Sequence, residues 1–225
     1  LSAAVAHGIR NPVAGIKVAA QLASLELPPE HPLRQNVDDI IGEADKLEAR
    51  ISTLLNFAKP FEPHPQPCRV DRLVATAVAS VRNRAASAGI ELVAAVQDDL
   101  PDVVLDEAQI EQVLLDLVAN AVDATAAGGR VTIGAESTAD GRSLRLTIGD
   151  TGTGITPANM ARVFKLFFTT KPNGTGFGLA VAKKIVERHG GTIALASEVG
   201  KGTRVTIDLP LTPERGAEGG AAPAR

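Results

Sequence analysis

The chain has 225 residues, a formal net charge of −3, 44% hydrophobic residues and 22% charged residues, which is typical of a globular protein with room for more than one domain. Aromatic residues make up only 3% and no basic stripe occurs, which argues against nucleic-acid binding. The single cysteine, Cys68, excludes a disulfide framework and a cysteine-based zinc site.

No apolar run approaches the roughly 20 residues that a membrane-spanning helix needs. The first residue, Leu1, already lies inside a helical pattern. We therefore interpret the chain as a cytoplasmic piece of a longer protein, in which only a missing N-terminal part could anchor it to a membrane.

Two helices are predicted at the N-terminus. Apolar residues recur at spacings of three and four over residues 1–27, and again as an unbroken heptad seam over residues 33–58. The connection around Pro28 and Pro29 is short, so the helices should pack as an antiparallel hairpin. One hairpin cannot bury both apolar stripes, whereas two can in a four-helix bundle, so we expect a homodimer through this region.

A proline-rich stretch separates the hairpin from an α+β domain. Residues 59–67 read KPFEPHPQP, which predicts an extended linker. Beyond it, helices are predicted at about 71–88, 107–126 and 176–188, and strands at about 68–70, 90–96, 102–105, 130–137, 143–149, 192–198 and 203–209. This order indicates a sandwich of a mixed sheet with helices on one face. The predicted domains are the hairpin (1–59), the linker (60–67), the α+β domain (68–211) and a disordered tail (212–225).

The helix expected at 107–126 carries a polar pair that could hold a metal ion. Asp116 and Asn120 are four residues apart, so their side chains share one face of the helix. A carboxylate and an amide oxygen there could hold hydrated Mg²⁺ against the oxygens of a triphosphate. Taken alone, Asn120 is better explained as a solvent-exposed polar residue.

A second candidate group follows the strand expected at 143–149. Asp150 stands directly before Thr151-Gly152-Thr153-Gly154. A carboxylate at a strand end can accept a hydrogen bond from an exocyclic amine such as that of adenine, and the two glycines permit positive φ and a close backbone approach. The alternative is an ordinary turn after an edge strand.

A glycine-rich run opens the helix expected at 176–188. Its free N–H groups and helix dipole favour phosphate, although a flexible loop fits the same pattern. Before it, residues 169–171 (Thr-Thr-Lys) could reach a terminal phosphate. The phenylalanines at 164, 167 and 168 could anchor a mobile lid or simply pack. The candidate residues of this segment are Phe168, Lys171, Gly174, Thr175, Gly176, Gly178 and Leu179.

Together these motifs, ordered over residues 68–211, resemble the ATP-binding domain shared by sensor histidine kinases, DNA gyrase, heat-shock chaperone ATPases and mismatch-repair ATPases. The resemblance implies a Bergerat-type α/β sandwich that binds ATP and Mg²⁺. It also implies that Asn120 is the magnesium ligand, that Asp150 reads adenine, and that the glycines at 152 and 154 form the turn beneath the base. The glycine-rich run and Lys171 would contact phosphate, and Gly200, Gly202 and Thr203 resemble the family's last glycine-threonine element.

The stretch His7-Gly8-Ile9-Arg10-Asn11-Pro12 is the other candidate for chemistry. His7 lies opposite the apolar stripe of its helix, and Asn11, one turn later, shares its face. An exposed imidazole can attack a γ-phosphoryl group, although most such histidines are ordinary surface residues. The stretch resembles the phosphoacceptor box of histidine kinases, usually His-Glu-Ile-Arg-Asn-Pro, and the Phe-Phe-Thr-Thr-Lys segment is similar to the nitrogen-regulation type of sensor kinase.

This resemblance implies autophosphorylation of His7 and transfer to an aspartate of a response-regulator receiver domain, with Asn11 positioning a water for a reverse phosphatase step. Gly8 departs from the pattern, because a carboxylate that accepts the proton usually stands there, so we expect slow autophosphorylation. Asp116 departs too, since sensor kinases often have Asn at this offset. It could support ATP hydrolysis or join the magnesium shell, and we favour the shell.

Two alternatives stay open. One is an ATP-hydrolysing conformational switch, which would turn over ATP without forming phosphohistidine. The other is a phosphatase or scaffold for a response regulator, in which Gly8 marks an impaired kinase.

Overall fold

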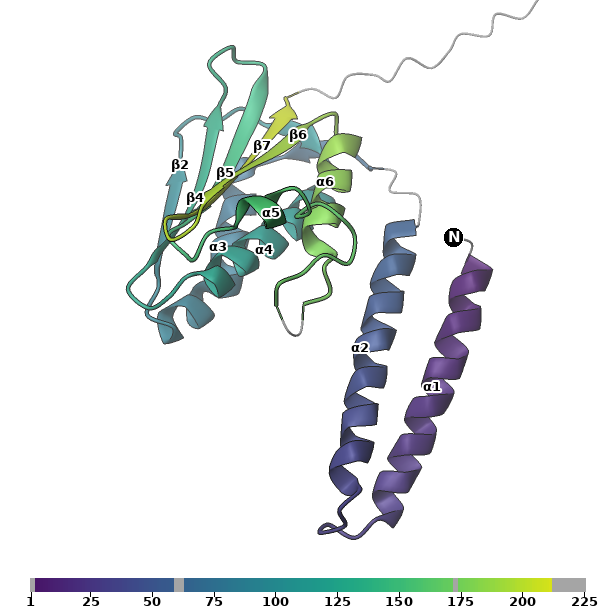
Figure 1. Ribbon diagram of the computed structural model, residues 1–225. Coiled ribbons are helices and arrows are strands. Elements are labelled where there is room, and N and C mark those ends of the chain that lie inside the picture. The colour runs from purple at the N-terminus through teal and green to yellow at the C-terminus, as the bar shows by residue number, and fades with distance from the viewer. Residues whose placement is uncertain (1–2, 59–62, 172–173, 212–225) are drawn as a thin grey trace, which may run out of the picture. The chain divides into compact units, whose positions relative to one another are not determined.

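The computed structural model describes residues 3–58, 63–171 and 174–211. Within these ranges it describes the backbone, but not the side chains, of residues 3–10, 49–50 and 52–58. The chain forms two compact units, of which one contains the N-terminal helices together with Leu166–Phe177 and the other contains the α+β domain. The positions of the units relative to one another are not determined, so each is described by itself (Figure 1). The predicted tail at 212–225 lies outside the described residues.

The predicted helical hairpin is confirmed. Helix α1 spans Ala3–Glu26 and continues through Pro12, and α2 spans Arg34–Ala58. Lys17 of α1 bridges two carboxylates of α2, with its Nζ 2.6 Å from Oδ1 of Asp45 and 3.1 Å from Oε2 of Glu48. Ion pairs between the helices therefore accompany the apolar seam in setting their register.

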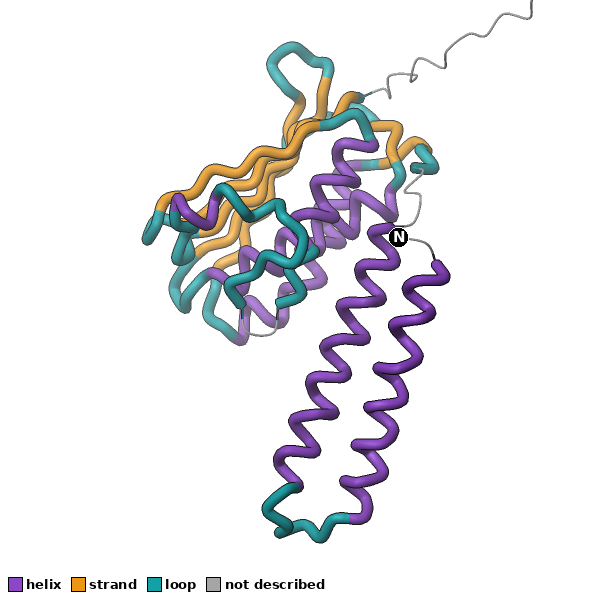
Figure 2. The backbone as a smooth tube through the Cα atoms, turned by 45° about the vertical axis from the view of Figure 1, so that its right-hand side comes forward, coloured by secondary structure: helices purple, strands orange, loops and turns teal. Residues whose placement is uncertain are grey.

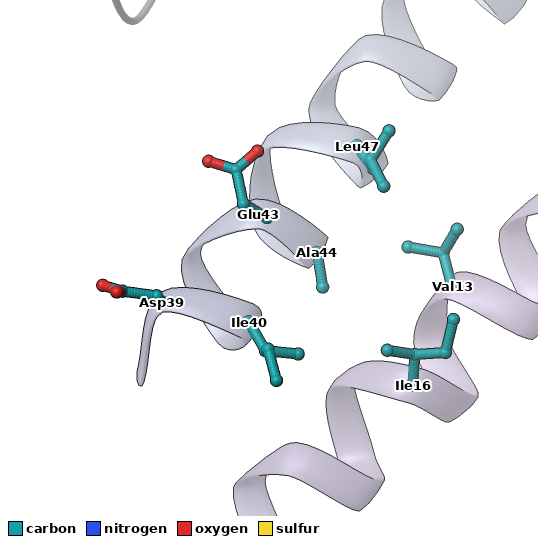
Figure 3. A pocket seen from close by; sticks show the side chains of 7 residues that line it. All are labelled: Val13, Ile16, Asp39, Ile40, Glu43, Ala44 and Leu47. Atoms are coloured by element: carbon teal, nitrogen blue, oxygen red, sulfur yellow. The ribbon is translucent and has the colours of Figure 1, made fainter. Parts of the chain in front are cut away.

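An apolar groove of about 280 Å³ runs between the two helices. Figure 3 shows aliphatic side chains of both helices pointing into it, whereas the carboxylates of Asp39 and Glu43 point away. Its lining is Val13, Ile16, Asp39, Ile40, Glu43, Ala44 and Leu47. Of these, Ile16 is 57% exposed and Ile40 is 47% exposed. A single hairpin thus leaves much of its apolar seam uncovered.

The second unit is a layer of helices on one face of a mixed sheet, as predicted (Figures 1 and 2). The sheet has the order β2 (Glu91–Val96), β4 (Arg130–Ser137), β5 (Ser143–Asp150), β7 (Gly202–Pro210) and β6 (Thr192–Glu198). In this sheet β2 pairs with β4 in parallel, and the other neighbouring strands pair antiparallel. The helices are α3 (Val70–Ser87), α4 (Glu107–Ala124), the short α5 (Pro157–Met160) and α6 (Gly178–Arg188).

The core lies between the sheet and the helices. It is formed by the alternating inward residues of the strands and by the apolar stripes of the helices. On β5 every second residue faces inward, and Leu144, Leu146 and Ile148 are at most 2% exposed. The predicted apolar stripe of α4 is confirmed, since all of its members are buried: Ile110, Val113, Leu114, Leu117, Val118 and Ala121. Burial of this stripe fixes the rotation of α4 and leaves Asp116 and Asn120 on its half-exposed side.

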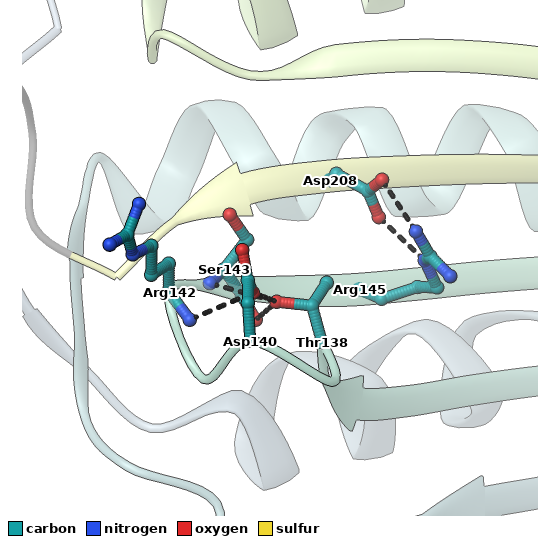
Figure 4. Close-up of polar contacts among 6 residues, drawn as sticks. All are labelled: Thr138, Asp140, Arg142, Ser143, Arg145 and Asp208. Atoms are coloured by element: carbon teal, nitrogen blue, oxygen red, sulfur yellow. Dashed lines mark hydrogen bonds and ion pairs between the residues drawn. The ribbon is translucent and has the colours of Figure 1, made fainter.

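The hairpin predicted from Asp140-Gly141 joins β4 to β5 (Figure 4). Gly141 has a φ of 65°, and Oδ1 of Asp140 accepts hydrogen bonds from the Thr138 hydroxyl (2.6 Å) and from the Arg142 N–H (3.1 Å). The same figure shows Arg145 of β5 donating two hydrogen bonds to Asp208 of β7, at 2.7 and 2.8 Å. These contacts fix the register at this end of the sheet.

Three predicted boundaries were wrong by a few residues. The strand predicted at 68–70 is β1 (Gln66–Cys68), which pairs only with β3 (Val103–Leu105). Pro67 is tolerated there because proline can occupy an edge strand. Helix α4 ends at Ala124, since the Thr125 hydroxyl bonds back to the Ala121 carbonyl at 2.7 Å. Helix α6 begins two residues later than predicted, because Gly176 has a φ of 71° and cannot be helical.

Asp106 anchors three parts of this unit at the N-terminus of α4. Its Oδ1 accepts the N–H of Gln109 at 3.1 Å and caps the helix, while its Oδ2 accepts the N–H of His64 in the linker at 3.0 Å. Its own N–H donates to Nε2 of His189 at 3.1 Å. Burial raises the pKa of Asp106, but hydrogen bonds from His64 and Gln109 outweigh it, so this pKa lies below its usual value.

Replacing Asp106 with Ala should lower the free energy of unfolding by about 1–2 kcal/mol, because the cap is lost. Asp106→Asn should cost less, since its amide oxygen can still accept the Gln109 N–H. A lowered carboxyl pKa stabilises the fold above the unfolded value of about 3.9 and stops doing so as the pH falls through the folded value. Urea titrations at pH 7 and at pH 3 measure both effects. Equal stability of Asp106→Ala and the parent chain at pH 7 would contradict this role.

Candidate nucleotide-binding site

Asp150 lies at the end of β5, where one of its carboxylate oxygens accepts backbone hydrogen bonds and the other does not. Oδ1 accepts the N–H of Gly152 at 2.9 Å and the N–H of Thr203 at 3.2 Å. Oδ2 accepts no hydrogen bond from the residues that the structure describes. Burial raises the pKa of Asp150, and the two N–H bonds offset this only in part. The carboxylate is thus oriented in advance, with one free acceptor.

Three glycines around Asp150 permit backbone contacts that no side chain would allow. A Cβ at Gly152 would overlap the carbonyl oxygen of Ala124, the last residue of α4, and a Cβ at Gly154 would overlap that of Glu198. A Cβ at Gly202 would overlap the carbonyl oxygen of Asp150 itself. The turn after β5 therefore packs closely between the end of α4 and the β6–β7 hairpin. The predicted glycine and threonine elements of this unit are brought together here.

The polar pair on α4 lies beside the N-terminus of α6. A Cβ built on Gly178 would be 3.7 Å from Nδ2 of Asn120 and 4.0 Å from Oδ2 of Asp116, so the two side chains share one face, as predicted. Oδ1 of Asp116 accepts a hydrogen bond from Nε2 of Gln112 at 2.9 Å. Burial raises the pKa of Asp116, and the Gln112 bond offsets this only in part. A half-buried carboxylate that has no ion pair at its Oδ2 with any described residue fits a divalent cation.

Residues 166–177 group with the helical hairpin, so their place relative to Asp150 is not determined. Phe167 has a φ of 67°, and a Cβ at Gly176 would overlap its carbonyl carbon. The rings of Phe167 and Phe177 meet edge to face, 4.9 Å apart. Phe168, Lys171, Gly174, Thr175 and Gly176 therefore remain predictions as nucleotide contacts, whereas Gly178 and Leu179 open α6 in the unit of Asp150.

The predicted phosphoacceptor is only partly described. His7 lies in α1, but its side chain is outside the described residues. Asn11, one turn later, is exposed. Their roles remain predictions.

Sequence reasoning missed one polar residue of the site, Ser197 on β6. Its Oγ lies 2.9 Å from Oγ1 of Thr203 and accepts the N–H of Ile155 at 2.8 Å. A serine in a half-exposed strand carries no signal by itself, but it faces Thr203 in the register of the β6–β7 hairpin. Pairing the two predicted strands about their glycine turn could have found it.

Comparison with known proteins adds two matches that together cover most of the chain. Residues 105–213 match the histidine kinase-, DNA gyrase B-, and HSP90-like ATPase family. Residues 1–60 match the His Kinase A (phospho-acceptor) domain. A phospho-acceptor domain followed by an ATPase domain of this type defines one class of signalling protein. The chain belongs to the sensor histidine kinases and contains their catalytic core.

Individual relatives agree over nearly the whole chain. The sensor histidine kinase ZraS of Escherichia coli K12 is 36% identical over 96% of this chain and 46% of its own length. Signal transduction histidine-protein kinase AtoS of the same organism is 32% identical over 95% of this chain and 35% of its own length. Sporulation kinase A of Bacillus subtilis is 33% identical over 93% of this chain and 34% of its own length. The chain thus spans less than half the length of these relatives.

Solved structures show the same fold. Full-length ShkA in complex with AMPPNP has a TM-score of 0.73 at 29% identity, over 94% of this chain and 46% of that one. Histidine kinase ThkA in complex with the response regulator TrrA has a TM-score of 0.69 at 26% identity, over 95% of this chain and 61% of that one. Within the described part of this chain, no helix is long and apolar enough to cross a membrane.

Asp116→Asn should stabilise the protein without nucleotide at pH 7, because it removes a half-buried carboxylate whose pKa is raised by burial. A raised folded pKa costs stability above the unfolded value of about 3.9, and the cost fades as the pH falls towards that value. The stability gain of the variant should therefore shrink from pH 7 to pH 4 in urea titrations.

Asp140→Asn is the matched control, because hydrogen bonds from Thr138 and the Arg142 N–H lower the pKa of Asp140. It should give no gain at pH 7. A destabilised Asp116→Asn at pH 7 would mean that the carboxylate has a partner that this account omits.

Proposed function

We propose that this core uses ATP and Mg²⁺ to phosphorylate His7 and then passes the phosphoryl group to an aspartate of a response-regulator receiver domain. The observation that carries the proposal is the Asp150 carboxylate, which is held by two N–H groups and has one open oxygen, in a chain whose first 60 residues match the phosphoacceptor domain.

The base of ATP would lie at the end of β5. Oδ2 of Asp150 would accept a hydrogen bond from the exocyclic amine of adenine, above the turn formed by Gly152 and Gly154. The phosphates would lie towards the N-terminus of α6, where the N–H groups around Gly178 and Leu179 and the helix dipole favour negative charge. By resemblance to the family, Lys171 and the glycine-rich run from 174 to 176 would contact the phosphates.

Asn120 and Asp116 are the residues that would hold Mg²⁺. They share one side of α4, and both lie beside Gly178 at the start of α6. Bound there, the ion would neutralise charge on the phosphate oxygens. Asp116→Asn should then lower nucleotide affinity together with any ATP hydrolysis. Loss of hydrolysis alone would instead assign Asp116 to orienting a water.

The transfer step forms a bond between an imidazole nitrogen of His7 and the γ-phosphorus, and it breaks the bond to the oxygen that leaves with ADP. Gly8 offers no carboxylate, so the imidazole proton would pass to another group, such as a solvent relay. The phosphoryl group would next move to the carboxylate of the receiver domain. Asn11, one turn after His7, would position a water for the reverse dephosphorylation.

The hairpin would act as a homodimer. Its uncovered apolar seam, including the groove in Figure 3, offers the surface that a second copy would bury in a four-helix bundle. ThkA has been solved together with the response regulator TrrA, and we infer a partner of the same class for this core.

Incubation with γ-labelled ATP and Mg²⁺ tests the proposal. The proposal predicts label on the protein that is acid-labile and stable to alkali, as a phosphoramidate is. Release of labelled phosphate without labelled protein would instead favour the ATP-hydrolysing switch. Nucleotide binding without either product would favour the phosphatase or scaffold, for which Gly8 is the supporting observation.

A further inference from the structure

Asp106 attaches the linker to the α+β domain through the carboxylate oxygen that does not cap α4. This oxygen, Oδ2, accepts the N–H of His64 at 3.0 Å and Nε2 of Gln109 at 2.9 Å. The imidazole of His64 adds little, because its Nδ1 lies 4.0 Å from Oδ2 and its side chain is 87% exposed. The Asp106 side chain, in contrast, is only 13% exposed. The backbone N–H of His64 therefore carries the contact.

The domain side of this contact is fixed by three elements. Asp106 directly follows β3, caps α4 with Oδ1, and donates its own N–H to Nε2 of His189 at 3.1 Å. Nδ1 of His189 lies 2.8 Å from the Ile185 carbonyl oxygen, which can only accept, so Nδ1 carries the hydrogen and Nε2 is the acceptor. Asp106 is thus held in place from β3, α4 and the end of α6.

The linker side depends on a single backbone donor. Residues 63 and 65 are both proline, so the His64 N–H is the one backbone N–H of residues 63–65. Regular pairing with β3 begins only at Gln66, the first residue of β1. If the bond to Asp106 broke, residues 64 and 65 would join the free linker and lengthen it by about 6 Å, at about 3.1 Å per residue of extended chain.

We propose that the hydrogen bond from His64 to Asp106 is a releasable latch, which shortens the free linker and so restrains autophosphorylation. The α+β domain must carry bound ATP to His7 and then move away before a receiver domain can take the phosphoryl group. A tether fixed closer to the domain permits fewer orientations for this motion. The effect on the rate rests on the proposed phosphorylation of His7, whereas the latch itself does not.

Asp106→Ser separates the latch from the helix cap. Serine is also a favoured N-cap, but the cap uses its only side-chain oxygen and leaves none for His64. In the whole chain, the His64 amide should exchange with deuterated water at least about tenfold faster, because one hydrogen bond to a charged acceptor is lost. Label from saturating γ-labelled ATP should be incorporated at least about threefold faster, with ADP affinity unchanged.

His64→Ala is the matched control, because it removes the imidazole and keeps the backbone N–H. It should match the parent chain in amide protection and in labelling rate. A loss of protection in His64→Ala as large as in Asp106→Ser would contradict a latch made by the backbone.

Asp106→Asn keeps the test decisive if Asp106→Ser fails to fold. Its amide oxygen can cap α4, while its amide nitrogen would face the His64 N–H as a second donor. Unchanged protection of the His64 amide would overturn the latch. Faster exchange with an unchanged or lower labelling rate would overturn the restraint. A parent chain that exchanges as expected but never labels His7 would contradict the proposed function instead.

Discussion

Asp150→Asn should reduce ADP affinity at least about 100-fold while leaving the fold intact. The amide oxygen of Asn can occupy the place of Oδ1 and accept the N–H groups of Gly152 and Thr203. The amide nitrogen then takes the place of Oδ2 and turns a hydrogen bond to the adenine amine into a clash of two donors. Hydrogen bonds to charged groups contribute about 1.5–3 kcal/mol, and an unmatched donor adds to the loss.

The fold should tolerate this change, because burial raises the pKa of Asp150, and the variant removes a charge whose burial costs stability. The measurement is calorimetric titration with ADP and Mg²⁺, alongside urea unfolding of the same samples. Asp208→Asn is the control, since it removes a carboxylate from the same sheet that pairs with Arg145 and is assigned no ligand. If Asp150→Asn bound ADP as tightly as Asp208→Asn did, Asp150 would not be the base reader.

Gly8→Glu should raise the rate of autophosphorylation by about 10²–10⁴-fold. The reason is chemical, since a carboxylate beside His7 can accept the imidazole proton as the bond to phosphorus forms. The position lies within α1, where replacing glycine should also favour the helix by about 0.5–1 kcal/mol.

Gly8→Gln separates these two effects, because it restores the helix propensity and the side-chain length without the basic oxygen. The initial rate of label incorporation from γ-labelled ATP is the readout. A rate unchanged in Gly8→Glu would show that proton removal does not limit the reaction. Equal acceleration by Gly8→Gln would assign the gain to the helix.

Much of the fold could be predicted because its elements bury one face at a fixed period. The stripe of α4 repeats every three or four residues, and so its rotation, with Asp116 and Asn120 facing away from the core, was predictable. The alternation along β5 likewise placed Asp150 at the end of a strand. Local turn chemistry predicted the hairpin at Gly141.

What could not be predicted depends on contacts between distant parts of the chain. β1 forms where it does because Gln66–Cys68 pairs with Val103–Leu105, although Pro67 argues locally against a strand. Asp106 binds His64 and His189, which are 42 and 83 residues away along the chain. The contact of Ser197 with Thr203 follows from the register of β6 against β7, and not from its neighbours in sequence.

The central claim is that His7 receives the phosphoryl group of ATP, and His7→Gln tests it most directly. The chain has four histidines, so His31→Gln, His64→Gln and His189→Gln serve as matched controls. After incubation with γ-labelled ATP and Mg²⁺, the account predicts acid-labile label on the parent chain and on the three controls, and none on His7→Gln. Label that persists in His7→Gln, or that disappears with another histidine, would contradict the account.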